Sequence, residues 1–162
     1  MKFLTALFAA AVCAPVLAAP VEADAVTLDK RVEIVNCRPL HNGRPKLFRV
    51  DVDVARAQAR AAGLTTGRSG DPHRYFNGDN LRFGVHNCDK RDAILWEYPI
   101  YWVGKNAVWQ KDTRTDRQPG GPTPLRVVYS NSNGGVQFCG VMTHSVVNDQ
   151  NQGLNFFQRC LP

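Results

Sequence analysis

The cysteines constrain this chain most strongly. Four of its five cysteines lie far apart in the sequence, at Cys37, Cys88, Cys139 and Cys160. No two of them have the gap of two to four residues that is typical of a zinc site. Four cysteines in a small domain instead indicate two disulfides, with three possible pairings, in an extracellular protein. A bond between the first and last of them would close a very long loop, which the loop-entropy model rates at about 4 to 5 kcal/mol.

The fifth cysteine, Cys13, belongs to an apolar N-terminal segment. After Lys2, residues 3–19 carry no charge and end in small side chains. This layout is typical of a secretory signal peptide, which we predict over residues 1–18. The alternative is a membrane anchor, but an anchor needs about 20 apolar residues and is disfavoured by Pro15. We therefore expect Cys13 to be removed with the signal peptide.

A short segment, residues 19–31, separates the predicted signal peptide from the rest of the chain. It ends in Lys30-Arg31, a dibasic pair that is typical of endoprotease processing sites. We interpret residues 19–31 as a propeptide and residues 32–162 as one mature, secreted domain. Basic and acidic residues are equally numerous in the removed part, so the mature domain keeps the net charge of +6. Such a surplus favours contact with RNA phosphates or anionic membranes.

Local sequence signals predict a β-hairpin and a helix in the first third of the domain. Asn42-Gly43 is a strong two-residue hairpin signal, because both residues tolerate positive φ. Asp51 and Asp53 are candidate N-caps for an Ala-rich stretch, residues 54–62, which Gly63 can end. We expect one α-helix of about three turns.

The remainder of the domain has strand and turn character. Apolar side chains alternate along residues 94–102, and apolar runs cover residues 125–129 and 136–143. Loops rich in Gly and Pro separate these segments. The expected fold class is α+β: an N-terminal β-hairpin, one α-helix packed on a central antiparallel β-sheet, long loops and two disulfides.

Three of the strand-like segments each place one ionisable side chain among apolar residues. These side chains are Glu97, Arg126 and His144. A carboxylate, a guanidinium and an imidazole on one sheet face could supply the base, the anion clamp and the acid of a phosphodiester transesterification. Arg–Glu pairs and hydrogen-bonded histidines are also common in protein cores, so on the residues alone both interpretations stay open.

Four ordered motifs carry a resemblance to a known family. They are Asp71-Pro72-His73-Arg74-Tyr75, Trp96-Glu97-Tyr98-Pro99-Ile100, the run from Gly121 to Tyr129, and the run from Cys139 to His144. In this order and spacing they resemble the signatures of fungal extracellular ribonucleases of the T1 class. Within that class the chain is most similar to the ribotoxins, and among these to the short ribotoxins of insect-pathogenic fungi. The similarity covers essentially all of residues 32–162.

The resemblance implies a catalytic role for each matching residue. Glu97 would be the general base that removes the 2′-hydroxyl proton, and His144 the general acid that protonates the 5′-oxygen leaving group, giving a 2′,3′-cyclic phosphate. Arg126 and His73 would hold the phosphate, which suits the fixed donor fork of arginine. Phe157 would pack against the reacting phosphate. No metal and no cofactor are implied.

Two further active-site residues are implied less directly. Tyr129 matches a tyrosine near the reacting phosphate. Asp71 stands where most T1-class enzymes carry Tyr, and it resembles the short ribotoxins in this respect. We place Asp71 in the site and expect it to favour the imidazolium of His73. The alternative is a turn residue before Pro72.

The base-recognition loop departs from the T1 pattern. Residues 76–79 lack the Tyr that caps guanine in those enzymes and offer only one acid for the base edge. We therefore do not expect a strict guanine preference on small substrates. The resemblance implies four substrate-binding residues, which are Tyr75, Asn77, Asp79 and Asn155.

The resemblance also implies the disulfide pairing, Cys37 with Cys160 and Cys88 with Cys139. The second bond would join the strand before Glu97 to the strand that leads into His144. It would thereby fix the distance between the base and the acid.

The implied function is that of a secreted, insecticidal endoribonuclease, expected to be a monomer. It would contact the anionic phospholipid membranes of target cells, enter their cytosol and bind the ribosome. There it would cleave one phosphodiester of the sarcin-ricin loop in large-subunit rRNA. Trp102 and Trp109 are interpreted either as core residues or as part of a lipid-contacting loop, and the basic residues of that loop either as a solvated face or as ribosome contacts. The alternatives are a non-toxic extracellular ribonuclease of the T1 class and a catalytically silent effector.

Overall fold

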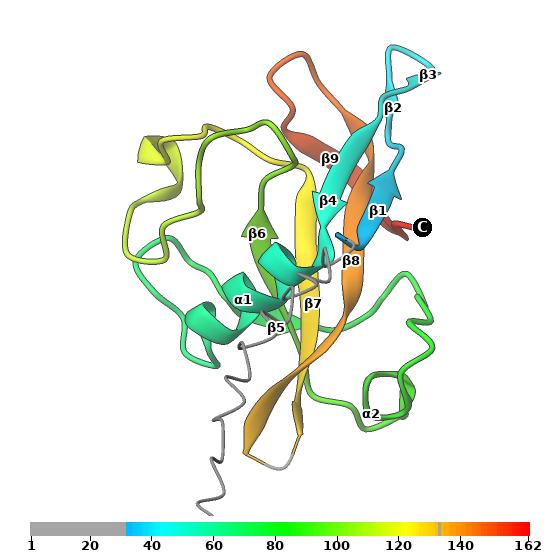
Figure 1. The fold of residues 1–162 in the computed structure, drawn as a ribbon, viewed down its shortest axis with the longest axis vertical. Helices are drawn as coiled ribbons and strands as arrows, with labels where there is room; N and C mark the ends of the chain where they lie inside the picture. Colours follow the sequence, from blue (N-terminus) through cyan, green and yellow to red (C-terminus); the bar gives the residue numbers. More distant parts are fainter. Residues whose placement is uncertain (1–31, 133) are drawn as a thin grey trace, which may run out of the picture. The chain divides into compact units, whose positions relative to one another are not determined.

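A computed structural model describes residues 32–132 and 134–162, so the predicted signal peptide and propeptide lie outside the described part. The described residues form a mixed α+β fold with one main helix and antiparallel strands, as predicted (Figure 1). None of their helices has the length and apolar character needed to cross a membrane.

The N-terminal strands form two antiparallel pairs. β1 (Ile34–Cys37) pairs with β4 (Phe48–Asp51), and between them β2 (Leu40–His41) pairs with β3 (Arg44–Pro45). The turn of the inner pair is Asn42-Gly43, whose φ angles are 50° and 74°. The predicted N-terminal hairpin is therefore confirmed, and its turn uses the positive φ values that Asn and Gly tolerate.

Helix α1 (Val52–Ala62) begins two residues earlier than the sequence predicts. Asp51 caps it, because its Oδ1 accepts hydrogen bonds from the backbone N–H groups of Asp53 and Val54 at 2.9 and 3.1 Å. Gly63 follows the helix with a φ of 67°, and its N–H donates to the carbonyl of Ala59. The buried face of α1 carries Val and Ala only, so the helix can lie close to the sheet.

The central sheet contains the three strands that the sequence predicts and several that it does not. β6 (Leu95–Ile100), β7 (Leu125–Ser132) and β8 (Gly135–Val147) are antiparallel neighbours. β5 (His73–Tyr75) extends the sheet beyond β6, and β9 (Gly153–Arg159) pairs with β8. Parallel pairing of β2 with β8 completes the order β3-β2-β8-β7-β6-β5. Two short helices, α2 (His86–Asp89) and the 3-10 helix η1 (Thr115–Arg117), lie in the connecting loops.

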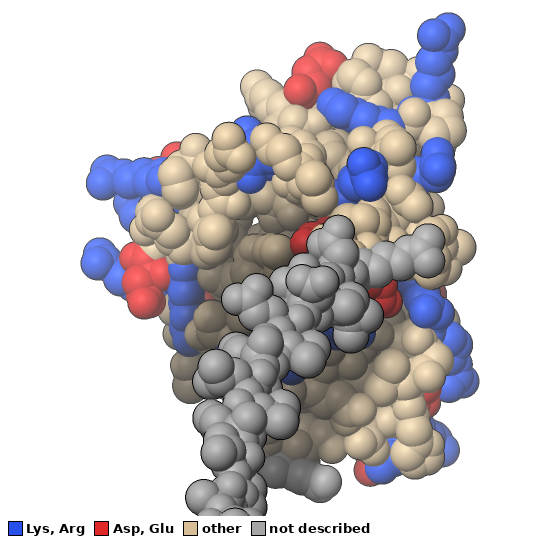
Figure 2. All heavy atoms as spheres, in the orientation of Figure 1, with Lys and Arg blue, Asp and Glu red and all other residues tan. Residues whose placement is uncertain are grey.

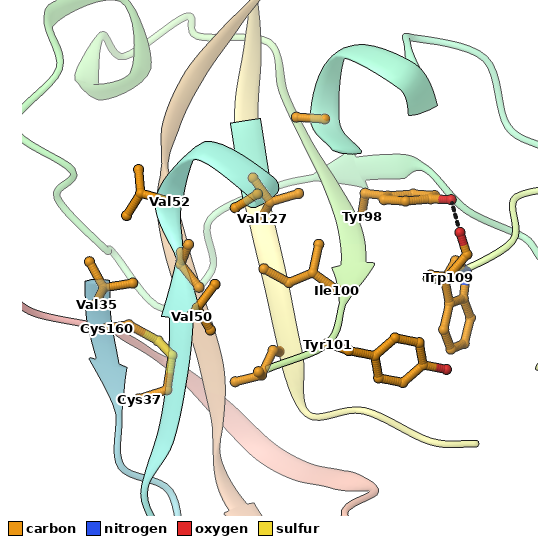
Figure 3. Packing of buried hydrophobic residues seen from close by; sticks show 14 of the residues in the cluster. Val35, Cys37, Val50, Val52, Tyr98, Ile100, Tyr101, Trp109, Val127 and Cys160 are labelled. Carbon is orange, nitrogen blue, oxygen red and sulfur yellow. Dashed lines mark hydrogen bonds between the residues drawn. A yellow bond between two sulfur atoms is a disulfide. The ribbon is translucent and has the colours of Figure 1, made fainter. Parts of the chain in front are cut away.

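Alternate residues of these strands enter two separate apolar clusters. The helix-side cluster contains Tyr98 and Ile100 of β6 and Val127 of β7, which pack together with strands β1 and β4 (Figure 3). The Tyr98 hydroxyl donates to the carbonyl of Trp109 at 2.8 Å. The opposite cluster contains Leu95 of β6, Val128 of β7 and Met142 of β8, together with residues of the loop that includes α2. The period of two along each strand assigns successive side chains to opposite faces.

Both predicted disulfides are present. Cys37 bonds to Cys160, with the two Cα atoms 4.5 Å apart, and Cys88 bonds to Cys139, with the Cα atoms 5.8 Å apart. The prediction that Cys88 lies in the strand before Glu97 is wrong, because Cys88 lies in α2. The second disulfide therefore joins the α2 loop, rather than a neighbouring strand, to β8.

The long loop between β6 and β7 covers residues 101–124 and contains both tryptophans of interest. Trp109 is buried in the helix-side cluster, which agrees with its interpretation as a core residue, and Trp102 packs against that cluster partly buried. Val103 and Val108 of the same loop are exposed. On the face that carries α1, basic side chains lie along the rim, including the region of this loop (Figure 2).

Candidate active site

The register of the sheet gathers the predicted catalytic residues on one face. Glu97 of β6 pairs with Val128, and Arg126 of β7 pairs with Met142, so both side chains lie on the face opposite α1. His144 follows two residues after Met142 on β8 and shares that face. The two edge strands add one residue each: His73 of β5 pairs with Glu97, and Phe157 of β9 pairs with His144.

Glu97, His73 and Asp71 form a continuous hydrogen-bonded row. Glu97 is only 6% exposed, and its Oε1 lies 2.6 Å from Nε2 of His73. Nδ1 of His73 lies 3.1 Å from Oδ1 of Asp71, which is also buried. The hydrogen bond to Asp71, followed by that to Glu97, raises the pKa of His73 to about 10. His73 is therefore an imidazolium at neutral pH that donates to both carboxylates, which confirms the expectation that Asp71 favours its charged form.

Two buried polar atoms of the site lack hydrogen-bond partners among the described residues. They are Oε2 of Glu97 and Nε of Arg126. Nη1 of Arg126 donates to the carbonyls of Thr123 and Leu125 at 3.0 and 2.9 Å, which fixes the guanidinium. Burial lowers the pKa of Arg126 while Glu97 and Asp71 oppose the shift, and an arginine remains protonated in any case. An unpaired acceptor and an unpaired donor are costly unless a ligand satisfies them.

His144 is oriented from two sides. Its Nδ1 lies 3.0 Å from the carbonyl oxygen of Asn155, an acceptor only, so Nδ1 carries a proton and donates it. Its ring lies on the ring of Phe157, with a centroid distance of 4.1 Å and an interplanar angle of 36°. Burial lowers the pKa of His144, the Asn155 carbonyl partly restores it, and the charge of Arg126 lowers it further. The imidazolium of His144 therefore gives up its Nε2 proton more readily than a free histidine does.

Gly153 is a residue of the site that sequence reasoning missed. It lies in β9, where a Cβ atom would overlap the imidazole ring of His144. The ring can occupy its position only because this residue has no side chain. A single glycine after a polar loop gives no sequence signal for such a role, since it is also typical of a turn.

The residues implied for base binding are tied to one another. The Tyr75 hydroxyl donates to Oδ1 of Asn77 at 3.1 Å, and the Asn77 side chain also bonds both backbone groups of Leu81. Oδ2 of Asp79 accepts from the backbone N–H of Phe157 at 3.2 Å, which joins this loop to β9. Asn155 takes a positive φ of 61°. The structure thus brings this loop beside the catalytic residues, with its polar side chains largely engaged.

Tyr129 lies elsewhere. It is 0% exposed, pairs with Trp96 and belongs to the helix-side cluster. Its hydroxyl donates to the carbonyl of Gly63 at 2.8 Å, just beyond the end of α1. The side chain of Tyr129 therefore lies on the face opposite to Glu97 and Arg126. Burial, followed by the charges of Tyr98 and Asp71, raises the pKa of its hydroxyl, so of the predicted site residues Asp71 acts on it directly.

In the described part of the chain, no group of three or more His, Cys, Asp and Glu side chains is arranged to hold a metal ion.

Comparisons with known proteins agree with this geometry. A family model described as ribonuclease matches residues 43–161. The structure of hirsutellin A from Hirsutella thompsonii is 70% identical in sequence, with a TM-score of 0.71 over 78% of this chain and 98% of that one. No curated protein sequence matches the chain.

Two more distant structures share the fold. The Aspergillus ribotoxin restrictocin is 21% identical, with a TM-score of 0.61 over 80% of this chain and 100% of that one. The cytotoxic ribonuclease α-sarcin is 21% identical, with a TM-score of 0.57 over 80% of this chain and 99% of that one. The match to the family model and the likeness to hirsutellin A show that this chain belongs to the ribonuclease family, among the fungal ribotoxins that its four motifs resemble.

Proposed function

We propose that residues 32–162 form a secreted cytotoxic endoribonuclease that cleaves one phosphodiester of the sarcin-ricin loop in large-subunit rRNA and so stops protein synthesis. The observation that carries the proposal is the pair of unsatisfied buried atoms, Oε2 of Glu97 and Nε of Arg126. They offer one proton acceptor and one cationic donor on the face that also holds His144. The names of the structural relatives, a ribotoxin and a cytotoxic ribonuclease, support the toxic activity.

Glu97 acts as the general base of the first step. Its Oε1 is held by the imidazolium of His73, so Oε2 is the oxygen left to accept a proton. Oε2 takes the proton of the ribose 2′-hydroxyl, and the 2′-oxygen forms a bond to phosphorus. The charges of Arg126 and His73 stabilise the additional negative charge of the phosphorane. Stabilisation of this kind by fixed donors is usually the largest single contribution to the rate enhancement of an enzyme.

His144 acts as the general acid. Because Nδ1 donates to the Asn155 carbonyl, the proton on Nε2 is the one available for transfer. Nε2 gives this proton to the 5′-oxygen as the bond from phosphorus to that oxygen breaks. The products are a 2′,3′-cyclic phosphate and a free 5′-hydroxyl, and Glu97 ends protonated while His144 ends neutral. Phe157 keeps one side of the imidazole and the reacting phosphate out of water.

Recognition of the substrate depends on the ribosome more than on one base. Asn77 and Asp79 are already bonded within the protein, so the loop offers few free polar atoms to a base edge. A toxin that takes its specificity from the ribosomal context needs less from this loop. The net charge of +6 supports binding to rRNA and, through the exposed Val103 and Val108 beside Lys105, contact with anionic membranes. Secretion through residues 1–18, removal of residues 19–31 and a monomeric state belong to the same proposal.

The test is to incubate the purified domain, residues 32–162, with intact eukaryotic ribosomes and separate the RNA on a gel. A single small fragment from the large-subunit rRNA is expected. The His144→Gln variant, with an unchanged thermal melting curve, should release no fragment. A smear of products would show a ribonuclease without ribosome specificity, and no cleavage by the unaltered protein would show a catalytically silent effector.

A further inference from the structure

A cavity adjoins the acid side of the active site. Its volume is about 660 Å³, within the range of about 300–1,000 Å³ that is typical of small-molecule sites. Arg126, His144 and Gly153 are among the residues that line it. Its lining also includes residues of two loops that take no part in the mechanism above, those that contain Arg68 and Arg114.

The position of the cavity defines which part of an RNA strand it faces. The nucleotide that supplies the 2′-hydroxyl lies against Glu97 and the loop of residues 75–79, none of which lines the cavity. His144 protonates the 5′-oxygen of the next nucleotide, and His144 does line it. A strand that reacts at this site therefore continues, on the 3′ side of the broken bond, toward the cavity.

The described residues that line the cavity include one unpaired cation, Arg68. Arg114 is engaged, because its Nε lies 3.0 Å from Oδ1 of Asp116. Arg68 is exposed, and no described residue forms a hydrogen bond, an ion pair or a ring contact with its side chain. Its charge is thus available to a ligand.

The backbone around Arg68 is held in place although its side chain is not. The N–H of Gly67 donates to the carbonyl of Asp71 at 2.9 Å, and that of Ser69 to the carbonyl of Lys111 at 2.9 Å. The Thr115 hydroxyl donates to the carbonyl of Ser69 at 2.8 Å. A fixed backbone with a free guanidinium reduces the entropy lost when an anion binds.

We infer that this cavity binds the ribonucleotide on the 3′ side of the scissile bond, with Arg68 contacting the phosphate that follows that nucleotide. The inference rests on the proposed ribonuclease function and adds a subsite to it. Arginine suits this contact because its planar fork matches phosphate oxygens. The subsite adds a contact to the leaving strand that a substrate without this second phosphate cannot make.

The test compares three substrates: the dinucleotide ApA, ApA with a 3′-terminal phosphate, and adenosine 2′,3′-cyclic phosphate. The protein should cleave the phosphorylated dinucleotide with a kcat/KM about three- to tenfold above that for ApA, as one charge-assisted contact gives. Arg68→Ala should abolish this advantage and leave hydrolysis of the cyclic phosphate, which has no 3′ nucleotide, unchanged. The matched control is Arg44→Ala, which removes an exposed arginine of the β2–β3 hairpin and should keep the advantage.

Two outcomes would overturn the inference. One is equal activity of Arg68→Ala and the unaltered protein on all three substrates, and the other is an equal loss on all three. If the unaltered protein cleaves no RNA, the proposed function fails and the subsite is judged by binding alone. The probe is then the phosphorylated dinucleotide with a 2′-deoxy group at the scissile position. The unaltered protein and Arg44→Ala should bind this probe more tightly than its unphosphorylated form, and Arg68→Ala should bind the two forms equally.

Discussion

The two faces of the central sheet are built from the same strands and differ in almost every physical respect. On the α1 side, β6 and β7 contribute Tyr98, Ile100 and Val127 to an apolar cluster in which the tyrosine hydroxyls are hydrogen-bonded. On the other side the neighbouring residues Glu97 and Arg126 leave buried polar atoms without partners. Along either strand, a core residue and a catalytic residue are direct neighbours in the sequence, because successive side chains point to opposite faces.

The comparison shows where stability and activity are located. The α1 face binds the helix to the sheet, and the buried polar atoms of its described residues that lack partners, such as Nε1 of Trp96 and of Trp109, are uncharged. The opposite face loses stability through desolvated charge, and a bound phosphate recovers that loss because it pairs with Arg126. Substitutions on the two faces should therefore separate into changes of stability and changes of rate.

The largest effect is expected for Glu97→Gln. Gln keeps the size of the side chain and an oxygen that can accept from His73, but it cannot take the 2′-hydroxyl proton. The rate of RNA cleavage should fall by a factor of about 10² to 10⁴, the usual contribution of a general base. Single-turnover kinetics measures the loss, and urea unfolding should show a folded protein. A variant that retains more than a tenth of the rate would contradict the assignment of the base.

Ile100→Ala should have the opposite profile. Ile100 is 1% exposed in the helix-side cluster, so its truncation leaves a cavity and should cost about 2–5 kcal/mol of unfolding free energy. At temperatures where the variant remains folded, its kcat/KM on a short RNA should stay within about threefold of the original, because the Ile100 side chain lies on the face opposite to Glu97 and Arg126. Urea unfolding and cleavage assays on the same preparation give both numbers. A loss of rate without a loss of stability would contradict the assignment of stability to the α1 face and of catalysis to the opposite face.

Gly153→Ala should reduce the rate while changing stability little. The added Cβ displaces the His144 ring from its position against Gly153 and Phe157 of β9, so the acid is misaligned and kcat should fall about tenfold. Gly135→Ala is the matched control, since a Cβ there meets nothing nearer than 3.8 Å and the residue has no positive φ. Wild-type kcat in Gly153→Ala would show that the close approach is not required.

The general outline of the fold could be predicted from the sequence, and the edge strands could not. Asn42-Gly43 and the Asp51 cap are local signals, and the period of two along residues 94–102 shows β6. β5 and β9 form only because long-range pairing with β6 and β8 satisfies their backbone groups, which a single sequence does not display.

The same division holds for the candidate site. Glu97, Arg126 and His144 stand out as ionisable residues in apolar runs, and the resemblance supplied His73, Asp71 and Phe157. Gly153 and Arg68 could not be found in this way, because one acts by lacking a side chain and the other by lacking a partner. Both properties exist only after the chain has folded.

A smaller effect is expected for Asp71→Asn. His73 has a pKa of about 10 in the folded protein against an unperturbed 6.5, so it stabilises the fold fully below about pH 6.5 and loses this contribution as the pH rises toward 10. Asp71→Asn removes the larger cause of the shift, so the His73 pKa and the stability difference between pH 6 and pH 9 should both decrease.

The measurements for Asp71→Asn are an NMR titration of His73, urea unfolding at pH 6 and pH 9, and the pH profile of kcat/KM. The rate should fall a few-fold, with its alkaline limb displaced to lower pH, because a neutral His73 no longer contributes charge at the phosphate. Asp92→Asn, which removes an exposed carboxylate from another loop, serves as the control. If Asp71→Asn leaves the rate and the pH profile unchanged, Asp71 has only a structural role as a residue of the turn before Pro72.

The smallest effect, and the sharpest test of the two-face comparison, is expected for Tyr129→Phe. The family resemblance places Tyr129 near the reacting phosphate, whereas the structure places its hydroxyl on the carbonyl of Gly63 beneath α1. Phe retains the ring and removes one hydrogen bond, so the unfolding free energy should fall by about 1 kcal/mol. The kcat and its pH profile should not change, because the hydroxyl bonds to Gly63 on the face opposite to Glu97 and Arg126. A clear decrease in kcat at unchanged stability would show instead that a change in side-chain bonding on the helix side alters the position of Arg126, which lies three residues away on the same strand. The two faces of the sheet would then not be independent.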